Sequence, residues 1–316
     1  MRLHLTRISV ALATTLAAGS ASALSITPVT ANPEATLITA LLAAGSDVNI
    51  VAGSESYQGS LADEQSGTYT DFVLAPSSGS TPTLTLADGI LLTSGTANIP
   101  MTNTTNEFDP VRPGSGSNAN LDALSGTNTN DANTLKFDFT TTTSNTTVSA
   151  QFVFGTDEFP TQSVTDIFGF FVDGVNYAQF PTGELISNTS GNPTNFIDNP
   201  VGAGLYDIEY NGLTPVFTVI GLLDPSISQH TIEIAVADTN DDIFDSGVFI
   251  TALAAGTATT GGGGNGGGIG TGGGNTGGGG GGGAGGGGNV PEPATLALLG
   301  LGIAGMGFRR GKRATR

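Results

Sequence analysis

A block of glycine limits which parts of this chain can fold. Of the 28 residues from 261 to 288, 22 are glycine, with no collagen-like period and almost no side chains to bury. A segment of this composition behaves as a flexible linker. The sequence therefore predicts four parts: a leader at 1–23, a folded body at 24–255, a Gly-rich linker at 256–288 and a tail at 289–316.

The body has the residue pattern of β-strands. Leu135, Phe137 and Phe139 alternate with Lys136 and Asp138, which places one face of an extended segment inside. The stretch TIEIAVA repeats the pattern, and VSAQFVF, IFGFFV, PVFTVIGL and GVFI are further short apolar runs separated by Gly, Pro, Asn and Asp. These runs predict a body composed mostly of short strands.

One helix is signalled near the start of the body. Asn32 can cap it, Pro33 suits its first position and Gly45 can end it. The fold class that we predict is all-β, an antiparallel β-sandwich with one short N-terminal helix packed against it.

Charge is distributed unevenly along the chain. Seven of the nine Lys and Arg residues lie near the two ends, so the body has only Arg112 and Lys136 against 26 acidic residues, a formal charge of about −24. Such a surface repels nucleic acid and attracts cations. A nucleic-acid partner is therefore excluded from our interpretation. Because the chain has no cysteine, no disulfide can hold the body together.

The leader has the order of a secretory signal peptide. A basic start, MRLHLTR, is followed by an apolar stretch at 8–18 and by a small-x-small site formed by Ala21 and Ala23. The apolar stretch is too short to span a bilayer. We predict export, with cleavage after Ala23.

The tail combines an apolar run with a basic end. Residues 294–308 carry no charge, and as a helix they would extend about 22 Å, against a bilayer core of about 30 Å. The basic cluster that follows should stay in the cytoplasm. The tail therefore predicts a single, thin C-terminal transmembrane helix. The two prolines around Glu292 keep the preceding backbone extended and accessible.

This tail resembles the PEP-CTERM sorting signal. The matching features are a Val-Pro-Glu-Pro motif, a short apolar helix and a terminal basic cluster, in that order. The resemblance implies recognition and tail removal by an exosortase, a membrane enzyme of exopolysaccharide-producing Gram-negative bacteria. The residues it assigns to sorting are Val290, Pro291, Glu292 and Pro293, with Arg309 and Arg310 starting the basic cluster.

Acidic residues follow or precede several of the expected strands. Carboxylate and amide oxygens are the ligands that Ca²⁺ takes, six to eight at a time. One interpretation is thus a Ca²⁺ site; the other, which the ordinary use of Asn and Asp in turns favours, is a set of solvated loops. Both stay open from sequence. The candidate ligands are Asp157, Glu158, Asp166, Asp238, Asn240, Asp242 and Asp245.

Some of the same residues resemble the choice-of-anchor L domain. That family has an acidic pair after a Phe-rich strand, an Asp before a Phe-Gly-Phe-like strand and an Asp-Ser pair before an apolar strand. Here these are Asp157-Glu158, the Asp of DIFGFF and Asp245-Ser246, and the resemblance extends over roughly residues 32–253. The family name describes domains found with different anchoring tails and assigns no activity.

An enzyme is not the expected function. The body has a single histidine, His230, and no Gly-x-Ser-x-Gly elbow. We expect an exported protein that is transiently anchored in the inner membrane and then displayed at the cell surface or in the extracellular matrix. Its expected role is structural or adhesive, in exopolysaccharide or biofilm. The alternatives are a secreted hydrolase of matrix polymers and a Ca²⁺-dependent module that binds another surface protein.

Overall fold

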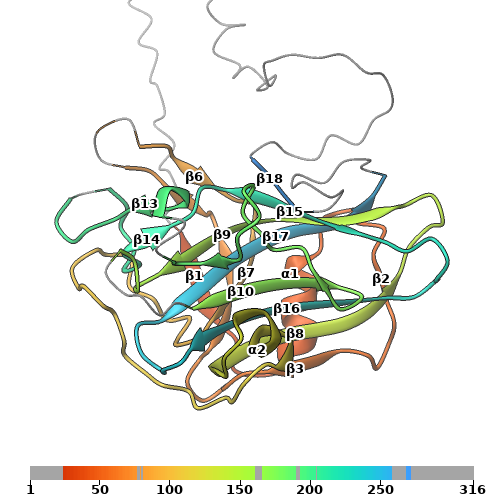
Figure 1. The fold of residues 1–316 in the computed structure, drawn as a ribbon, viewed down its shortest axis with the longest axis horizontal. Helices are drawn as coiled ribbons and strands as arrows, with labels where there is room; N and C mark the ends of the chain where they lie inside the picture. Colours follow the sequence, from red (N-terminus) through yellow and green to blue (C-terminus); the bar gives the residue numbers. More distant parts are fainter. Residues whose placement is uncertain are drawn as a thin grey trace, which may run out of the picture. The chain divides into compact units, whose positions relative to one another are not determined.

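The computed structural model describes residues 24–76, 79, 81–160, 166–189, 193–203, 205–257 and 268–271 (Figure 1). The predicted signal peptide, its cleavage site and the whole tail with its sorting motif and membrane helix lie outside the described residues. Within the described ranges, no helix has the length and apolar character needed to cross a membrane.

The larger sheet contains nine strands. Its main path is β1 (Ser25–Pro28), β4 (Ser66–Thr70), β7 (Gly89–Thr93), β17 (Ser246–Gly256), β9 (Thr147–Thr156), β14 (Gly212–Leu213) and β13 (Ile197–Asp198). Strand β15 (Phe217–Leu222) pairs with β9 on the same edge as β14, and β15 in turn pairs with β18 (Gly268–Thr271).

The smaller sheet contains seven strands. Its path is β11 (Val175–Asn176), β10 (Ile167–Val172), β16 (His230–Thr239), β8 (Thr129–Thr140) and β2 (Asn49–Ile50), with β12 (Ile186–Ser187) on β10 and β3 (Ser56–Gln58) on β8. A separate hairpin-like pair joins β5 (Val73–Leu74) to β6 (Leu84–Thr85), and a 3-10 turn lies at Pro193–Asn195. All pairings between these named strands are antiparallel, so the all-β antiparallel prediction is confirmed.

The two sheets face each other across a shared apolar core. Phe137 and Phe139 of β8, on the smaller sheet, belong to the same buried cluster as Phe152 and Phe154 of β9, on the larger sheet. Lys136, between Leu135 and Phe137, is exposed, as the period-two pattern predicts. In Figure 1, β15, β9 and β17 occupy the upper layer and β10, β16 and β8 the lower one. Burial of these aromatic faces holds the layers together.

Two α-helices cover parts of the sheets. Helix α1 (Pro33–Leu41) confirms the predicted helix, but Asn32 has left-handed geometry and gives no side-chain cap, and the helix ends before Gly45. Helix α2 (Ala119–Ser125) was not expected from the sequence, because seven residues are too few to show a helical period. Leu121 of α2 packs on the outer face of the smaller sheet, where Ala235 and Ala237 are buried as well.

A short strand lies inside the stretch that we expected to be a linker. Residues Gly268–Thr271 pair with Phe217–Ile220 of β15. An edge strand presents unpaired backbone N–H and C=O groups. A Gly-rich segment can form hydrogen bonds with these groups because strand pairing needs no side chain. The expectation of an unstructured linker therefore does not hold for these four residues.

Candidate acidic site at one end of the sheets

Two aspartates lie side by side where β9 and β17 meet. In the larger sheet Thr156 of β9 pairs with Ser246 of β17, and the next step brings Asp157 opposite Asp245. The backbone N–H of Asp157 donates to the carbonyl of Asp245 at 3.1 Å. The register of this strand pair therefore fixes both residues at the same end of the sheet.

The smaller sheet places a second pair at its corresponding end. Ile167 of β10 pairs with Ala237 of β16, so that Asp166, one residue earlier, lies opposite Asp238. On its other side, β16 has a register irregularity against β8 between Val236 and Asp238. Bulges of this kind redirect side chains and are common beside functional sites. Figure 1 shows the ends of β9 and β16 and the starts of β10 and β17 together on the left of the view.

The four aspartates are buried and mostly without hydrogen-bond partners. Each has less than 5% of its surface exposed, and Asp238 has none. Both carboxyl oxygens of Asp166 and of Asp238 lack a partner, as does one oxygen (Oδ2) each of Asp157 and Asp245. An unpaired buried carboxylate is among the most costly groups that a protein can contain.

This environment raises the pKa of each of the four carboxyl groups. Burial raises the pKa of Asp157, Asp166 and Asp238 well above the ordinary value, and neighbouring acidic groups raise it further. Burial is also the main cause that raises the pKa of Asp245 to about 8. The hydroxyl groups of Ser246 and Ser94 partly offset these effects at Asp166 and Asp238 but make no well-formed hydrogen bond with either.

Glu158 joins the two pairs. Its Oε2 accepts a hydrogen bond from the backbone N–H of Asp166 at 3.2 Å, and its backbone carbonyl accepts one from Asn188 at 3.1 Å. Burial, followed by the charges of Asp241 and Asp238, raises the pKa of Glu158 to about 9. We call Asp157, Glu158, Asp166, Asp238 and Asp245 the acidic cluster.

Small residues make room for the acidic cluster. A Cβ atom on Gly95, just beyond β7, would lie 1.8 Å from Oδ2 of Asp245, so any larger residue there would displace the Asp245 carboxylate. A Cβ atom on Gly247 would lie 2.2 Å from the hydroxyl oxygen of Tyr210. The Tyr210 hydroxyl is itself buried without a partner, and burial together with the charge of Asp157 raises its pKa well above the ordinary value.

The structure does not bring Asn240 and Asp242 into the acidic cluster. Both are exposed in the turn between β16 and β17. The side-chain oxygen of Asn240 accepts a hydrogen bond from Thr127 at 2.7 Å, and Asp242 pairs with Arg112 at 3.4 Å. Five of the seven predicted ligands are thus clustered and two bind elsewhere. As the side chains stand, no three or more His, Asp or Glu residues of the described part are grouped so that they could hold a metal ion.

Several neighbours of the acidic cluster were not predicted from sequence. They are Gly95, Tyr210, Asn211 and Ser246, of which the last three have buried side-chain oxygens without partners. Asn211 also donates its backbone N–H to Asp157 at 3.2 Å. Tyr210 and Asn211 come from the loop before β14, far from the acidic motifs in sequence. Only the pairing of β14 with the end of β9 reveals their position.

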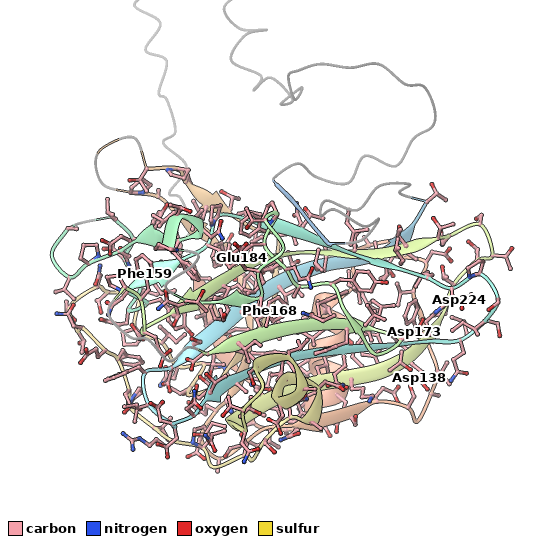
Figure 2. All side chains as sticks on the ribbon, in the orientation of Figure 1. Asp138, Phe159, Phe168, Asp173, Glu184 and Asp224 are labelled. Carbon is pink, nitrogen blue, oxygen red and sulfur yellow. The ribbon has the colours of Figure 1, made fainter. Side chains whose placement is uncertain are left out.

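The single histidine of the body lies at the opposite end of the sheets. His230, at the start of β16, is buried, and its Nδ1 lies 2.7 Å from Oδ2 of Asp173. Asp173 follows β10, whereas Asp166 precedes it, so the length of β10 separates this pair from the acidic cluster. Figure 2 labels Asp173 on the right of the view and Phe159, the neighbour of Glu158, on the left.

Two family models match the sequence. The one described as the choice-of-anchor L domain matches residues 26–255, and the one described as the PEP-CTERM protein-sorting motif matches residues 289–313. No curated protein and no solved structure matches the chain. The first match includes all the strands around the acidic cluster, and the second coincides with the basic tail.

Proposed function

This chain belongs to the choice-of-anchor L family, and from that premise we propose that it is a structural or adhesive component of the cell surface or extracellular matrix. Its PEP-CTERM motif supports export and sorting by an exosortase, and its main domain fits a surface protein. Within this class we propose a role in an exopolysaccharide matrix or biofilm. Before processing, the apolar tail would anchor the chain in the inner membrane.

One observation carries this proposal: the body and the sorting motif occur in order on a single chain. The matched domain ends at residue 255 and the matched motif begins at residue 289. The segment between them is dominated by glycine, a composition typical of linkers between a domain and a separate signal. A domain tethered in this way is suited to contact with partners outside the membrane.

We also propose that the body does not act as an enzyme. The ring of its one histidine is buried and paired with Asp173, and the described interactions of this ring include no serine or threonine hydroxyl. The competing hydrolase function has one feature in its favour, since His230 borders a cavity of about 230 Å³ together with Ser226 and Ser228. Loss of polymer cleavage in His230→Ala would support that alternative.

Substitution in the sorting motif tests the main proposal. We expect Glu292→Ala, or deletion of residues 291–293, to leave export intact and to block removal of the tail. Glu107→Ala, an exposed glutamate of the body, is the matched control and should be processed normally. Intact-mass spectrometry of the exported chain from exosortase-containing cells measures the outcome. Identical processing of the Glu292 variant and the control would refute the assignment.

A further inference from the structure

We propose that the acidic cluster is a binding site for one hard divalent cation, for which Ca²⁺ is the best candidate. This inference goes beyond the proposed surface role and does not depend on it. The site differs from a loop site between β16 and β17, because its carboxylates come from the ends of four strands in two sheets.

The first argument is the lack of hydrogen-bond donors. Asp157, Asp166 and Asp238 each have 1% or less of their surface exposed, and five of their six carboxyl oxygens have no partner. Buried carboxylates in folded proteins are normally paired, hydrogen-bonded or bound to metal. Because ion pairing and hydrogen bonding are largely absent here, a bound metal ion accounts for the arrangement.

The second argument is the lack of a basic side chain. The only Lys and Arg residues between positions 24 and 257 are Arg112 and Lys136. Lys136 pairs with Glu233 at 3.1 Å, and Arg112 pairs with Asp109 and Asp242. None of the ion pairs in the described part of the chain includes a member of the acidic cluster. Neutralisation must therefore come from protons or from a bound ion.

The third argument concerns the type of ligand. Protonation could pair the carboxyl group of Asp166 with that of Asp238, but it brings no new donor to the other unpartnered carboxyl oxygens, on Asp157 and Asp245. A divalent ion instead uses the oxygens directly, and Ca²⁺ takes six to eight of them in a flexible geometry. Neutral oxygens are available as well, on Tyr210, Asn211 and Ser246, all buried and without partners.

Binding must turn some side chains, because the carboxylates do not yet converge. The carboxylates of Asp166 and Asp238 make no well-formed hydrogen bond, so little opposes rotation about their side-chain torsions. By contrast, the Asp157 carboxylate accepts a hydrogen bond from the backbone N–H of Asn211, and the Glu158 carboxylate accepts one from the backbone N–H of Asp166. We infer that these two groups stay in place and that Asp166 and Asp238 close on the ion.

We infer that the ion enters from a cavity that borders two neighbours of the acidic cluster. It has a volume of about 200 Å³, and Phe159 and Asn211, two immediate neighbours of the acidic cluster, are among its lining residues. Glu107 and Asp198 line it too, which gives the opening a negative charge that attracts cations.

Thermal unfolding of the exported chain tests the site. At a Ca²⁺ concentration about 100-fold above Kd, we expect Tm to rise by roughly 5–10 °C relative to EDTA at equal ionic strength. The double variant Asp166→Asn/Asp238→Asn should lose the rise. Asp242→Asn, a matched charge change in the neighbouring turn, should keep it. A Ca²⁺ response that persists in the double variant, or none in the unsubstituted chain, would overturn the proposal.

Luminescence locates the ion independently of folding stability. Tb³⁺ replaces Ca²⁺ in oxygen sites and is sensitised by nearby tyrosine, and this chain has no tryptophan to interfere. We expect sensitised Tb³⁺ emission that excess Ca²⁺ displaces and that Tyr210→Phe strongly reduces. Tyr177→Phe, at the other end of β10, should leave it unchanged. Equal emission from the two Tyr→Phe variants would place the ion elsewhere.

Discussion

Glu209 and Asp238 are equally buried acidic side chains, with 1% and 0% of their surface exposed, yet their surroundings are opposite. The carboxylate of Glu209 accepts hydrogen bonds from the backbone N–H and hydroxyl of Thr104, the backbone N–H of Thr105 and the hydroxyl of Thr102. Asp238 accepts none at either carboxyl oxygen.

The pKa values follow this difference. Burial favours a higher pKa at Glu209, but the hydrogen bonds from Thr102, Thr105 and Thr104 outweigh it, and the pKa is lowered. At Asp238 burial dominates, the charge of Asp166 adds to it, and the pKa is raised well above the ordinary value. The chain thus buries one carboxylate with donors and a group of others without them. The second arrangement is stable only with protons or a cation in place.

The largest expected effect is a dependence of stability on pH when cations are removed. The pKa of Glu158 is raised to about 9 and that of Asp245 to about 8, while both are near 4 in the unfolded chain. The folded state therefore holds more protons between about pH 4 and pH 9, and the free energy of unfolding falls as pH rises through this window. In EDTA we expect a loss of several kcal/mol, at about 1.4 kcal/mol per unit of pKa difference.

Chemical denaturation across this pH range measures the effect, and saturating Ca²⁺ should flatten the profile. Glu209 provides the contrast, because its pKa is lowered and the stability that it contributes is lost as pH falls. The Glu209→Gln variant should therefore still lose stability at alkaline pH, as the unsubstituted chain does. A stability in EDTA that stays constant from about pH 5 to pH 9 would contradict the burial of uncompensated carboxylates.

A smaller effect is expected from Glu209→Gln itself at neutral pH. The substitution replaces a charged acceptor with an amide and leaves backbone N–H groups of Thr104 and Thr105 poorly paired. We expect a destabilisation of about 2–3 kcal/mol, independent of Ca²⁺. Glu107→Gln on the exposed neighbouring segment should stay within about 0.5 kcal/mol. Equal stabilities of the two variants in urea denaturation would show that the donors around Glu209 contribute little.

The smallest effect concerns the space beside Asp245. In Gly95→Ala the added methyl group would displace the Asp245 carboxylate, and we expect a destabilisation of about 1–2 kcal/mol together with weaker Ca²⁺ binding. Gly256→Ala is the matched control, because its nearest neighbour would lie 3.8 Å away. Thermal unfolding with and without Ca²⁺ compares them. If Gly95→Ala bound Ca²⁺ as tightly as the control, Asp245 would not be a ligand.

Much of the fold could be predicted from periodicity. The alternation around Lys136 placed β8 correctly, and the Phe-rich runs fell on β9, β10, β15 and β17. Helix α2 was missed because its signal is local: Asn118 accepts hydrogen bonds from the N–H groups of Asn120 and Leu121, and no apolar period extends beyond seven residues. Pattern analysis detects long amphipathic segments better than short capped turns.

The acidic site was predictable only in part, for a physical reason. Asp157, Asp166 and Asp245 flank strands, so their position at strand ends follows from sequence. Which strand ends lie together depends on sheet order, and the neighbour relations β9–β17 and β10–β16 are long-range. Sequence proximity suggested instead that Asn240 and Asp242 would join Asp238, but the turn directs them to Thr127 and Arg112.

Isothermal titration calorimetry of Ca²⁺ into the chelator-treated exported chain tests the central claim most directly. We predict one binding site per chain with release of protons, seen as a heat that varies with the ionisation enthalpy of the buffer, because the ion displaces protons from carboxyl groups of raised pKa. The Asp166→Asn/Asp238→Asn variant should give no such heat. Absence of binding in the unsubstituted chain, or the same binding heat in this variant, would contradict the account.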